Sequence, residues 1–423
     1  MEDIIQYQEY IIQPNTQDLK HLIQLASKHS FDLIPVDSKT YKLKTRALVG
    51  FIHLSNTKLY FKPKIPFTSL FYMITRTNSI KRVNVLKHLP AWLSTKDGDP
   101  LALVKIFIHI IEDFIEHGIR KQYKFIEEDL SSPIGTILIQ KNITKLPWEL
   151  NTIWCEYDDF TLDVFPNQII RYTVDIIRRS LRDSQNKNLM NKVEKRLTGV
   201  TLLKSINVED IDKINLTKSL DEYRPVLSFC RFILSNLTID EVTGKNMFSS
   251  FLINMNTLYE SFVFSTIKSE FIEFQIVKEK LKITGSMNER GKFIVYEPDI
   301  VVRENGIKEI TSNINSENNV SNSNLIFVGD AKYKYLDTSK DELSIQKDFF
   351  QVLSYALFMK ANKGIIFYPQ NKLEDHDPIL FKFSQYGIDI IILSLPLGGF
   401  SWNELDYKIK ESMKELKSIL STE

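Results

Sequence analysis

Two short segments of the sequence carry acidic and basic side chains where strands are expected. One reads Glu-Pro-Asp-Ile-Val-Val over residues 297–302, and the other reads Phe-Val-Gly-Asp-Ala-Lys-Tyr-Lys over residues 327–334. Because side chains alternate between the two faces of a strand, Asp330 and Lys332 are expected on the same face, about 7 Å apart. Pairing of the two strands would bring Asp299 beside Asp330. Two carboxylates and one ammonium group would then meet at one place.

These side chains suit a metal-assisted reaction at a phosphodiester. Carboxylates are hard oxygen ligands, and Mg²⁺ takes one or two of them while it also binds water and phosphate oxygens. Such a metal polarises a phosphodiester and lowers the pKa of a bound water, and a lysine nearby can stabilise developing charge. A single Asp-x-Lys triplet is more often an exposed strand face. Asp330 instead follows the apolar residues 325–328, where an unpaired charge is costly, so both interpretations stay open from these residues alone.

The C-terminal part of the chain alternates helical and strand patterns around these segments, which is typical of an α/β domain. The spacing of apolar residues predicts helices at 247–270 and 341–361 and strands at 292–303, 324–336, 363–368 and 387–394. Ser401 and Glu404 match a capping box, which predicts the start of a closing helix.

The first 245 residues divide into a β-rich and a helical part. Residues 41–66 have strand character, and the apolar positions from Leu101 to about Glu128 recur at helical spacing. Further helices are expected at 160–182 and 187–204, with a strand at 135–140. We therefore expect a β-rich N-terminal domain (1–100), a mainly helical middle region (101–245) and a C-terminal domain (246–423).

Composition excludes several classes of protein. The 423 residues include 54 Lys and Arg against 53 Asp and Glu, so the chain is not a uniformly basic nucleic-acid coat, and 43% hydrophobic residues exclude a disordered chain. Two cysteines, Cys155 and Cys230, are too few for a disulfide framework or a Cys-based metal site. The start of the sequence lacks a secretory signal and no apolar segment is long enough to span a membrane. We expect a cytoplasmic protein without a membrane partner.

One glycine-rich segment comes close to a phosphate-binding loop. Residues 285–293 read Gly-Ser-Met-Asn-Glu-Arg-Gly-Lys-Phe, with one residue too many between the glycines and Phe293 in place of the required Ser or Thr. We therefore expect a turn between strands, and no nucleotide bound by this chain itself.

Three motifs together resemble the PD-(D/E)xK nuclease superfamily: Pro298-Asp299, then Asp330-Ala-Lys332-Tyr-Lys334, then Gln351 and Tyr355 in the spacing of its QxxxY helix. Other segments resemble, in the same order, the sequence blocks of the McrC family, the nuclease subunit of McrBC-type restriction systems, specific for 5-methylcytosine or related. They are residues 48–54, 61–65, 118–123, 157–167 and 256–262. The resemblance spans most of residues 45–370, with one departure at Ile134-Gly135, where the family tends to have Arg-Gly.

The resemblance implies a role for each matching position. Asp299, Asp330 and Glu260 correspond to catalytic acids that bind Mg²⁺, or alternatively Mn²⁺. Lys332 corresponds to the catalytic lysine, and Gln351 and Tyr355 to a pair that orients the site or contacts the DNA backbone. The domain would have a mixed central sheet flanked by helices. Glu260 is placed only by the resemblance, because periodicity puts it away from the apolar face of its predicted helix, as a solvated residue.

The resemblance further implies a DNA endonuclease subunit of a GTP-dependent restriction system active in phage defence. Such a subunit hydrolyses phosphodiester bonds of double-stranded DNA, and its N-terminal region docks on a McrB-like hexameric AAA+ GTPase and stimulates it. The alternative is a non-catalytic adaptor that activates the AAA+ partner and keeps the nuclease fold only structurally. Two basic clusters, one from Arg76 to Lys87 and one from Arg178 to Arg196, could contact either DNA or the partner.

Overall fold

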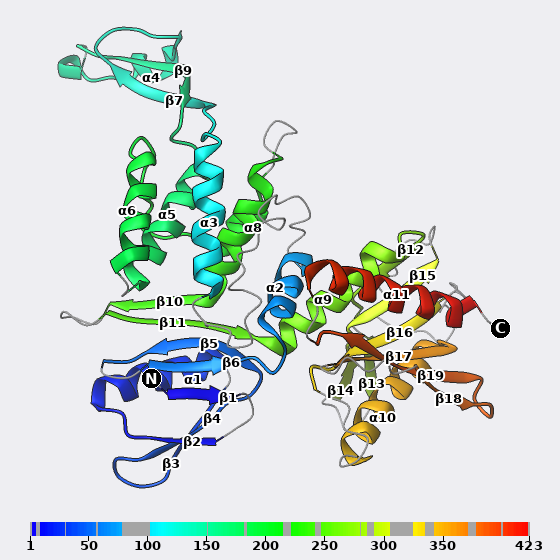
Figure 1. The fold of residues 1–423 in the computed structure, drawn as a ribbon. Helices are drawn as coiled ribbons and strands as arrows, with labels where there is room; N and C mark the ends of the chain where they lie inside the picture. Colours follow the sequence, from blue (N-terminus) through cyan, green and yellow to red (C-terminus); the bar gives the residue numbers. More distant parts are fainter. Residues whose placement is uncertain are drawn as a thin grey trace. The chain divides into compact units, whose positions relative to one another are not determined.

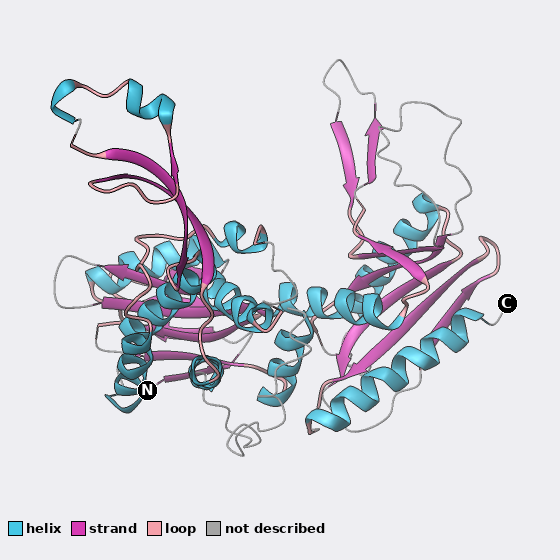
Figure 2. Cartoon of the chain, turned by 90° about the horizontal axis from the view of Figure 1, so that it is seen from above, coloured by secondary structure: helices cyan, strands magenta, loops and turns pink. Residues whose placement is uncertain are grey.

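The chain is described here by a computed structural model that covers residues 2–5, 9–29, 31–55, 58–77, 102–149, 151–181, 184–214, 221–241, 247–279, 281–285, 292–304, 325–334, 342–370, 378–398 and 401–421. These residues form two compact units (Figure 1). The first unit contains the described residues of 1–81 and 251–423, and the second contains those of 101–250. Each unit mixes helices and strands (Figure 2).

The N-terminal part of the first unit is rich in strands, as residues 41–66 predicted. Strand β5 lies between β6 and the end of β11, and β2, β4 and β3 form a separate antiparallel sheet. At Gly50 in β5 the backbone has a φ of 136° and approaches Phe251 so closely that a Cβ would meet its carbonyl oxygen. The elements are β1 (Glu2–Ile5), β2 (Glu9–Ile12), α1 (Thr16–His29), β3 (Asp32–Pro35), β4 (Tyr41–Lys44), β5 (Leu48–His53), β6 (Lys58–Lys62) and α2 (Phe67–Thr77).

The C-terminal part of the first unit is built on one mixed six-stranded sheet, in the order β12-β15-β16-β17-β19-β18. The pairs β12–β15, β15–β16 and β19–β18 are antiparallel, whereas β16, β17 and β19 run parallel to one another. The elements are β11 (Met247–Asn254), α9 (Met255–Glu270), β12 (Phe274–Val277), β13 (Leu281–Gly285), β14 (Lys292–Tyr296), β15 (Ile300–Glu304), β16 (Leu325–Ala331), α10 (Glu342–Met359), β17 (Lys363–Gln370), β18 (Ile379–Phe383), β19 (Ile388–Pro396) and α11 (Trp402–Ser421).

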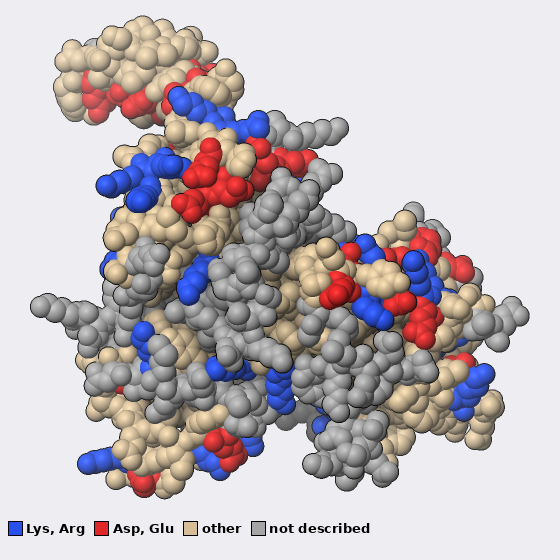
Figure 3. Space-filling model, in the orientation of Figure 1, with Lys and Arg blue, Asp and Glu red and all other residues tan. Residues whose placement is uncertain are grey.

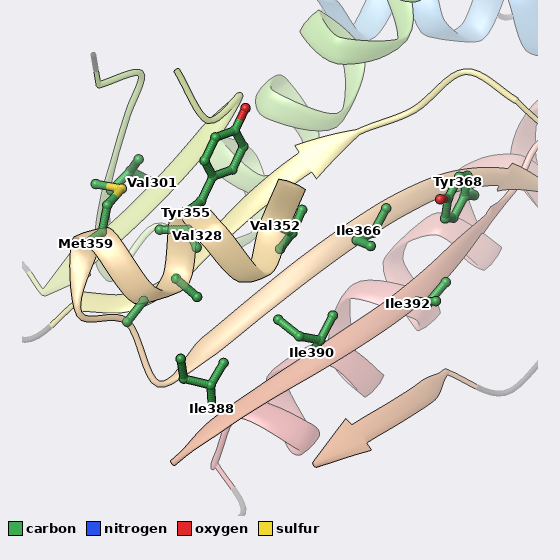
Figure 4. Packing of buried hydrophobic residues seen from close by; sticks show 12 residues of the cluster. Val301, Val328, Val352, Tyr355, Met359, Ile366, Tyr368, Ile388, Ile390 and Ile392 are labelled. Atoms are coloured by element: carbon green, nitrogen blue, oxygen red, sulfur yellow. The ribbon is translucent and has the colours of Figure 1, made fainter. Parts of the chain in front are cut away.

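Helices cover both faces of this sheet, as the predicted domain requires. On one face, Val328, Ile366 and Ile390 from three strands pack against Val352 and Tyr355 of α10 (Figure 4). The alternate residues of the strands point to the other face, where Phe327 contacts Phe271 after α9, and where α11 packs on β19 and α9. Burying both faces explains why these strands are almost continuously apolar. The expected mixed sheet flanked by helices is therefore confirmed.

The second unit combines helices with a separate small sheet. Helices α3, α5, α6 and α8 pack against one another, and β7 and β8 pair with β9 in a three-stranded antiparallel sheet. The elements are α3 (Ala102–Glu116), β7 (Gln122–Leu130), β8 (Thr136–Ile137), α4 (Ile139–Ile143), a 3₁₀ turn (Pro147–Glu149), β9 (Ile153–Thr161), α5 (Phe165–Ser180), α6 (Ser184–Arg196), α7 (Val208–Asp212), α8 (Tyr223–Asn236) and β10 (Leu237–Glu241).

Two residues of the segment 157–167 connect neighbouring loops to α5 in the second unit. Asp163 accepts hydrogen bonds from the Thr201 backbone and from Gln168, and these bonds lower the pKa of Asp163 to about 2 although burial opposes them. The buried amide of Asn167 donates to the carbonyl oxygens of Arg120 and Leu162. Both side chains therefore fasten loops to α5.

Several expected helices begin or end elsewhere. The helix predicted for 101–128 ends at Glu116, because Gly118 adopts a φ of 97° that suits a helix C-terminus, and residues 122–130 form β7. The helix predicted from 160 begins at Phe165, where Pro166 occupies its first turn. The strand predicted at 135–140 is limited to Thr136–Ile137 and is followed by α4.

The C-terminal elements show similar differences. The helix predicted for 247–270 begins at Met255, because the Asn254 side chain caps it by accepting from the Asn256 backbone, and the residues before it form β11. The strand predicted for 292–303 is divided into β14 and β15, with Pro298 between them. The capping box is confirmed, since the backbone and hydroxyl of Ser401 both donate to the Glu404 carboxylate at 2.9 Å.

Other expectations concern single features. Strands β13 and β14 pair as antiparallel neighbours, and the residues 286–291 of the glycine-rich segment between them lie outside the described residues. Cys155 and Cys230 are both buried and neither forms a disulfide, as predicted. Within the described residues, no helix is long and apolar enough to cross a membrane.

Candidate active site

Asp330 and Lys332 lie at the end of β16, where the strand leaves the core. Val328 faces α10 in the core, and Asp330, two residues on, continues on the same face with only 2% of its surface exposed. The Lys332 ammonium lies 2.5 Å from Asp330 Oδ2, and the Lys332 backbone N–H donates to the Phe367 carbonyl of β17. The neighbouring strand thus fixes the lysine against the buried acid.

Asp299 joins this pair from the adjacent strand. The register of β15 on β16 pairs Ile300 with Gly329, so Asp299 comes opposite Asp330. Asp299 Oδ2 accepts a hydrogen bond of 2.8 Å from the Ala331 backbone N–H. The structure therefore brings Asp299, Asp330 and Lys332 to one end of the sheet, as strand pairing predicted.

The surroundings favour the neutral forms of both acids. Burial, together with the negative charge of Asp330, raises the pKa of Asp299 to about 7, although the hydrogen bond from Ala331 lowers it. Burial also raises the pKa of Asp330, and the Lys332 ammonium only partly opposes this. For Lys332, burial lowers the pKa, but the charges of Asp330, Asp299 and Asp348 outweigh burial and raise it. Negative charge at this place is therefore under-compensated, and an added cation would stabilise it.

Gln351 and Tyr355 lie one turn apart on α10, beside the segment that carries Asp299. Gln351 Nε2 donates to the Tyr355 hydroxyl at 2.6 Å, and this hydroxyl lies 3.5 Å from the carbonyl oxygen of Glu297. The Tyr355 ring packs in the core while its oxygen points out of the cluster (Figure 4). Burial raises the pKa of Tyr355. The pair thus fastens α10 to the backbone just before Asp299.

Glu260 is placed near the two aspartates, but it has a partner of its own. Its side chain on α9 is about one-third exposed and forms an ion pair with Lys278, which follows β12. Its charge still raises the pKa of Asp299 and Asp330, so the three carboxylates are electrostatically coupled. Among the described residues, no group of three or more His, Cys, Asp or Glu side chains is arranged to hold a metal ion.

Sequence reasoning missed one buried acid next to this site. Asp348 on α10 is 6% exposed, and Tyr368 and Lys334 both contact it. Its spacing in the sequence could have identified it, because Asp348, Gln351 and Tyr355 occupy positions i, i+3 and i+7 of one helix face.

Three arginines of the two predicted basic clusters take part in ion pairs within their own units. Arg76 pairs with Asp406 of α11 and donates to the Tyr72 hydroxyl. Arg178 and Arg179 both pair with the buried Asp175. Lys81, Arg82 and Lys87 lie outside the described residues. On the face shown in Figure 3, acidic and basic side chains lie in small intermixed clusters.

The donor set at the end of β16 fits a hard divalent cation. Asp299 and Asp330 offer carboxylate oxygens, and burial raises their pKa values, so a bound cation would stabilise their charged forms. Mg²⁺ needs no more than one or two protein carboxylates, since water and phosphate oxygens complete its coordination.

This charge arrangement predicts how the metal-free protein responds to pH. The pKa of Asp299 is about 7 in the folded chain and about 4 in an unfolded one. The folded chain therefore binds more protons between these values, and stability falls as the pH rises through this window.

We expect Asp299→Asn to raise the Tm above pH 7 in the presence of EDTA, by about 2–4 °C for each kcal/mol relieved, and the gain to vanish below about pH 4. Thermal unfolding of both proteins across this range tests it, and a lower Tm for the variant above pH 7 contradicts it.

A solved structure with a similar fold and a protein-family model both match this chain. One similar chain comes from the refined half-complex of the tetradecameric assembly of Thermococcus gammatolerans McrB AAA+ hexamers with bound McrC. The TM-score is 0.61 and the sequence identity 17%, and the match covers 98% of this chain and 99% of that chain. A chain of the cryo-EM structure of the Thermococcus gammatolerans McrBC complex has a TM-score of 0.43 and 19% identity, covering 64% and 87%. No curated protein matches the sequence. The family model of the McrBC 5-methylcytosine restriction system component matches residues 43–369, well over half of the sequence, and the chain belongs to this family.

Proposed function

We propose that this chain is the DNA endonuclease subunit of a GTP-dependent restriction system, of the PD-(D/E)xK type and dependent on Mg²⁺. The observation that carries the proposal is the meeting of Asp299, Asp330 and Lys332 at the end of a mixed sheet. The charged forms of the buried Asp330 and the half-buried Asp299 are unfavourable for stability, as their raised pKa values indicate. A function that uses the charge accounts for their presence.

Each residue of the site has a distinct task in this proposal. Asp299 and Asp330 would hold the metal, which when bound supplies polarisation of the phosphodiester and a water of lowered pKa. Lys332 stays protonated because the acids raise its pKa, so its ammonium can stabilise negative charge that develops on the phosphate. Gln351 and Tyr355 keep the segment of Asp299 in position through their contact with the Glu297 carbonyl. Glu260, released from Lys278, could add a further ligand or contact a water.

We further propose that an AAA+ GTPase of the McrB type is the motor partner of this chain. Support comes from the family and from the similar chain in the assembly of McrB hexamers with bound McrC. The resemblance to the McrC family implies docking by the N-terminal residues 1–100. The second unit offers another candidate surface, because large apolar side chains are exposed on β7, β9 and α4 and in the 3₁₀ turn. They are Tyr123, Phe125, Ile139, Ile143, Trp148 and Phe160.

We call these six side chains the exposed apolar residues of the second unit. Trp148 and Tyr123 are each 74% exposed, and Tyr123 stacks at a tilt on Phe160 across the strand pair. Exposed apolar side chains commonly mark a protein interface, and tryptophan and tyrosine often contribute most to its affinity.

The second candidate function is the non-catalytic adaptor, which would stimulate the GTPase and keep the sheet only for stability. The intact acids and lysine favour the nuclease. Substituting one acid separates the two functions, because the adaptor does not need it.

We expect Asp330→Ala to abolish DNA cleavage by the chain mixed with its motor subunit, GTP, Mg²⁺ and substrate DNA. Losing a metal ligand removes several kcal/mol of transition-state stabilisation, a rate loss of about 10³-fold or more. GTPase stimulation should be preserved, because the residue lies in the sheet core and not on an exposed surface. Unchanged cleavage by the variant would favour the adaptor.

We expect Trp148→Ser combined with Phe125→Ser to weaken GTPase stimulation by about tenfold or more, since each exposed aromatic side chain at an interface can contribute more than 1 kcal/mol. The matched control is Tyr407→Ser, which removes a similarly exposed aromatic side chain from α11. Titration of the chain against the GTPase rate measures the effect. Equal stimulation by the double variant and the control would place docking elsewhere, for example in residues 1–100.

A further inference from the structure

A buried carboxylate lies next to the proposed active site and has no task in the mechanism above. Asp348 Oδ2 accepts a hydrogen bond of 2.7 Å from the Tyr368 hydroxyl and lies 2.6 Å from the Lys334 ammonium. Tyr368 comes from β17 and Lys334 from the segment after β16. Asp348 Oδ2 of α10 therefore links β17 to the segment that follows β16. We call these three side chains the Asp348 cluster.

The Asp348 cluster adjoins Asp330 and Lys332. Lys334, the ion-pair partner of Asp348, lies only two residues along the chain from Lys332. Tyr368 is in the same core cluster as Val328 and Ile366, on the sheet face where Asp330 continues. The chain also turns sharply after the strand, because the Lys334 backbone N–H donates to the Lys332 carbonyl at 2.9 Å. Any restraint on Lys334 therefore acts on the segment that carries Lys332.

Burial explains why these three groups stay together. A carboxylate with 6% exposure is unfavourable unless it is paired and hydrogen-bonded. Tyr368 and Lys334 supply the hydrogen bond and the opposite charge. The Lys334 side chain keeps 35% exposure, so the ion pair holds its ammonium at the boundary between the core and solvent instead of leaving it to move freely.

The charge near the site indicates what Lys334 can bind. A phosphodiester strand that approaches this end of the sheet meets three aspartates at positions 299, 330 and 348, and the Lys332 ammonium is already paired with Asp330. Lysine is a common phosphate-binding residue, and an ammonium can contact a carboxylate and a phosphate together because it carries three N–H donors.

We propose that Lys334 binds a DNA phosphate next to the scissile phosphate. Asp348, held by Tyr368, is the positioning residue for Lys334. This inference rests on the proposed nuclease function and deepens it. It assigns one phosphate contact to Lys334, whereas Lys332 acts at the scissile phosphate.

The first test is the salt dependence of DNA binding by the full-length chain with its AAA+ partner, with Ca²⁺ in place of Mg²⁺ to prevent cleavage. Loss of one phosphate contact makes the slope of log K against log[salt] shallower by about 0.9 for duplex DNA. We expect this change for Lys334→Gln and not for Lys334→Arg, which keeps the charge. The control is Lys414→Gln, an exposed lysine of α11 on the opposite side of the sheet.

The second test asks whether Asp348 acts through Lys334. Asp348→Asn keeps the shape of the side chain and can still accept from Tyr368, but it loses the charge that holds the ammonium. We expect it to slow cleavage in the wild-type background and to have little further effect in the Lys334→Gln background, as coupled residues do in a double-mutant cycle. Unfolding temperatures of all variants, measured alongside, separate this coupling from a loss of stability.

The outcomes distinguish this inference from the function on which it rests. A wild-type complex that neither binds nor cuts DNA overturns both. A wild-type complex that cuts DNA, with the same salt slope for Lys334→Gln as for Lys414→Gln, overturns the phosphate contact and leaves the nuclease standing. Equal, additive effects of Asp348→Asn in both backgrounds overturn the positioning role.

Discussion

The interaction on which the site depends is the ion pair between Asp330 and Lys332 at the end of β16. A carboxylate with 2% exposure is unfavourable in a protein core, and the lysine beside it compensates for only part of that cost. The rest of the sheet is arranged to hold this unfavourable charge. Strand β15 places Asp299 opposite it, and β17 fixes the Lys332 backbone through the Phe367 carbonyl.

Helix α10 packs on one face of the sheet and contributes polar side chains to the same end of it. Its apolar residues pack on the parallel strands, whereas its polar residues Asp348, Gln351 and Tyr355 point along one face toward the site. Gln351 and Tyr355 fasten the Glu297 backbone before Asp299, and Asp348 fastens the Lys334 segment after Lys332. The packing of one amphipathic helix therefore fixes both ends of the charged cluster, and stability is given up locally to keep two acids and a lysine in contact.

The sequence allowed the main parts of the site to be predicted, because they follow from local rules. Alternation along a strand places Asp330 and Lys332 together, and the pairing of adjacent strands adds Asp299. Asp348 could not be found in this way, since its role depends on contacts with Tyr368 and Lys334 that only the folded sheet creates. The helix boundaries at Gly118 and Asn254 were missed for a related reason. Apolar spacing continued through them, whereas single residues with a special backbone conformation or a capping side chain ended or began the helix. The contacts of α2 with α9 and α11, which join distant segments into one unit, likewise leave no local pattern.

The central claim is that Asp299 and Asp330 form a site for a divalent cation, and metal binding tests it most directly. Mn²⁺ has unpaired electrons, so its binding to the full-length chain can be followed by electron paramagnetic resonance without any partner or DNA. We expect the wild-type chain to bind Mn²⁺ in competition with Mg²⁺, and Asp330→Asn to lose this binding, whereas Asp210→Asn, on an exposed ion pair with Lys213, keeps it. Equal Mn²⁺ binding by the wild-type and Asp330→Asn chains would contradict the account.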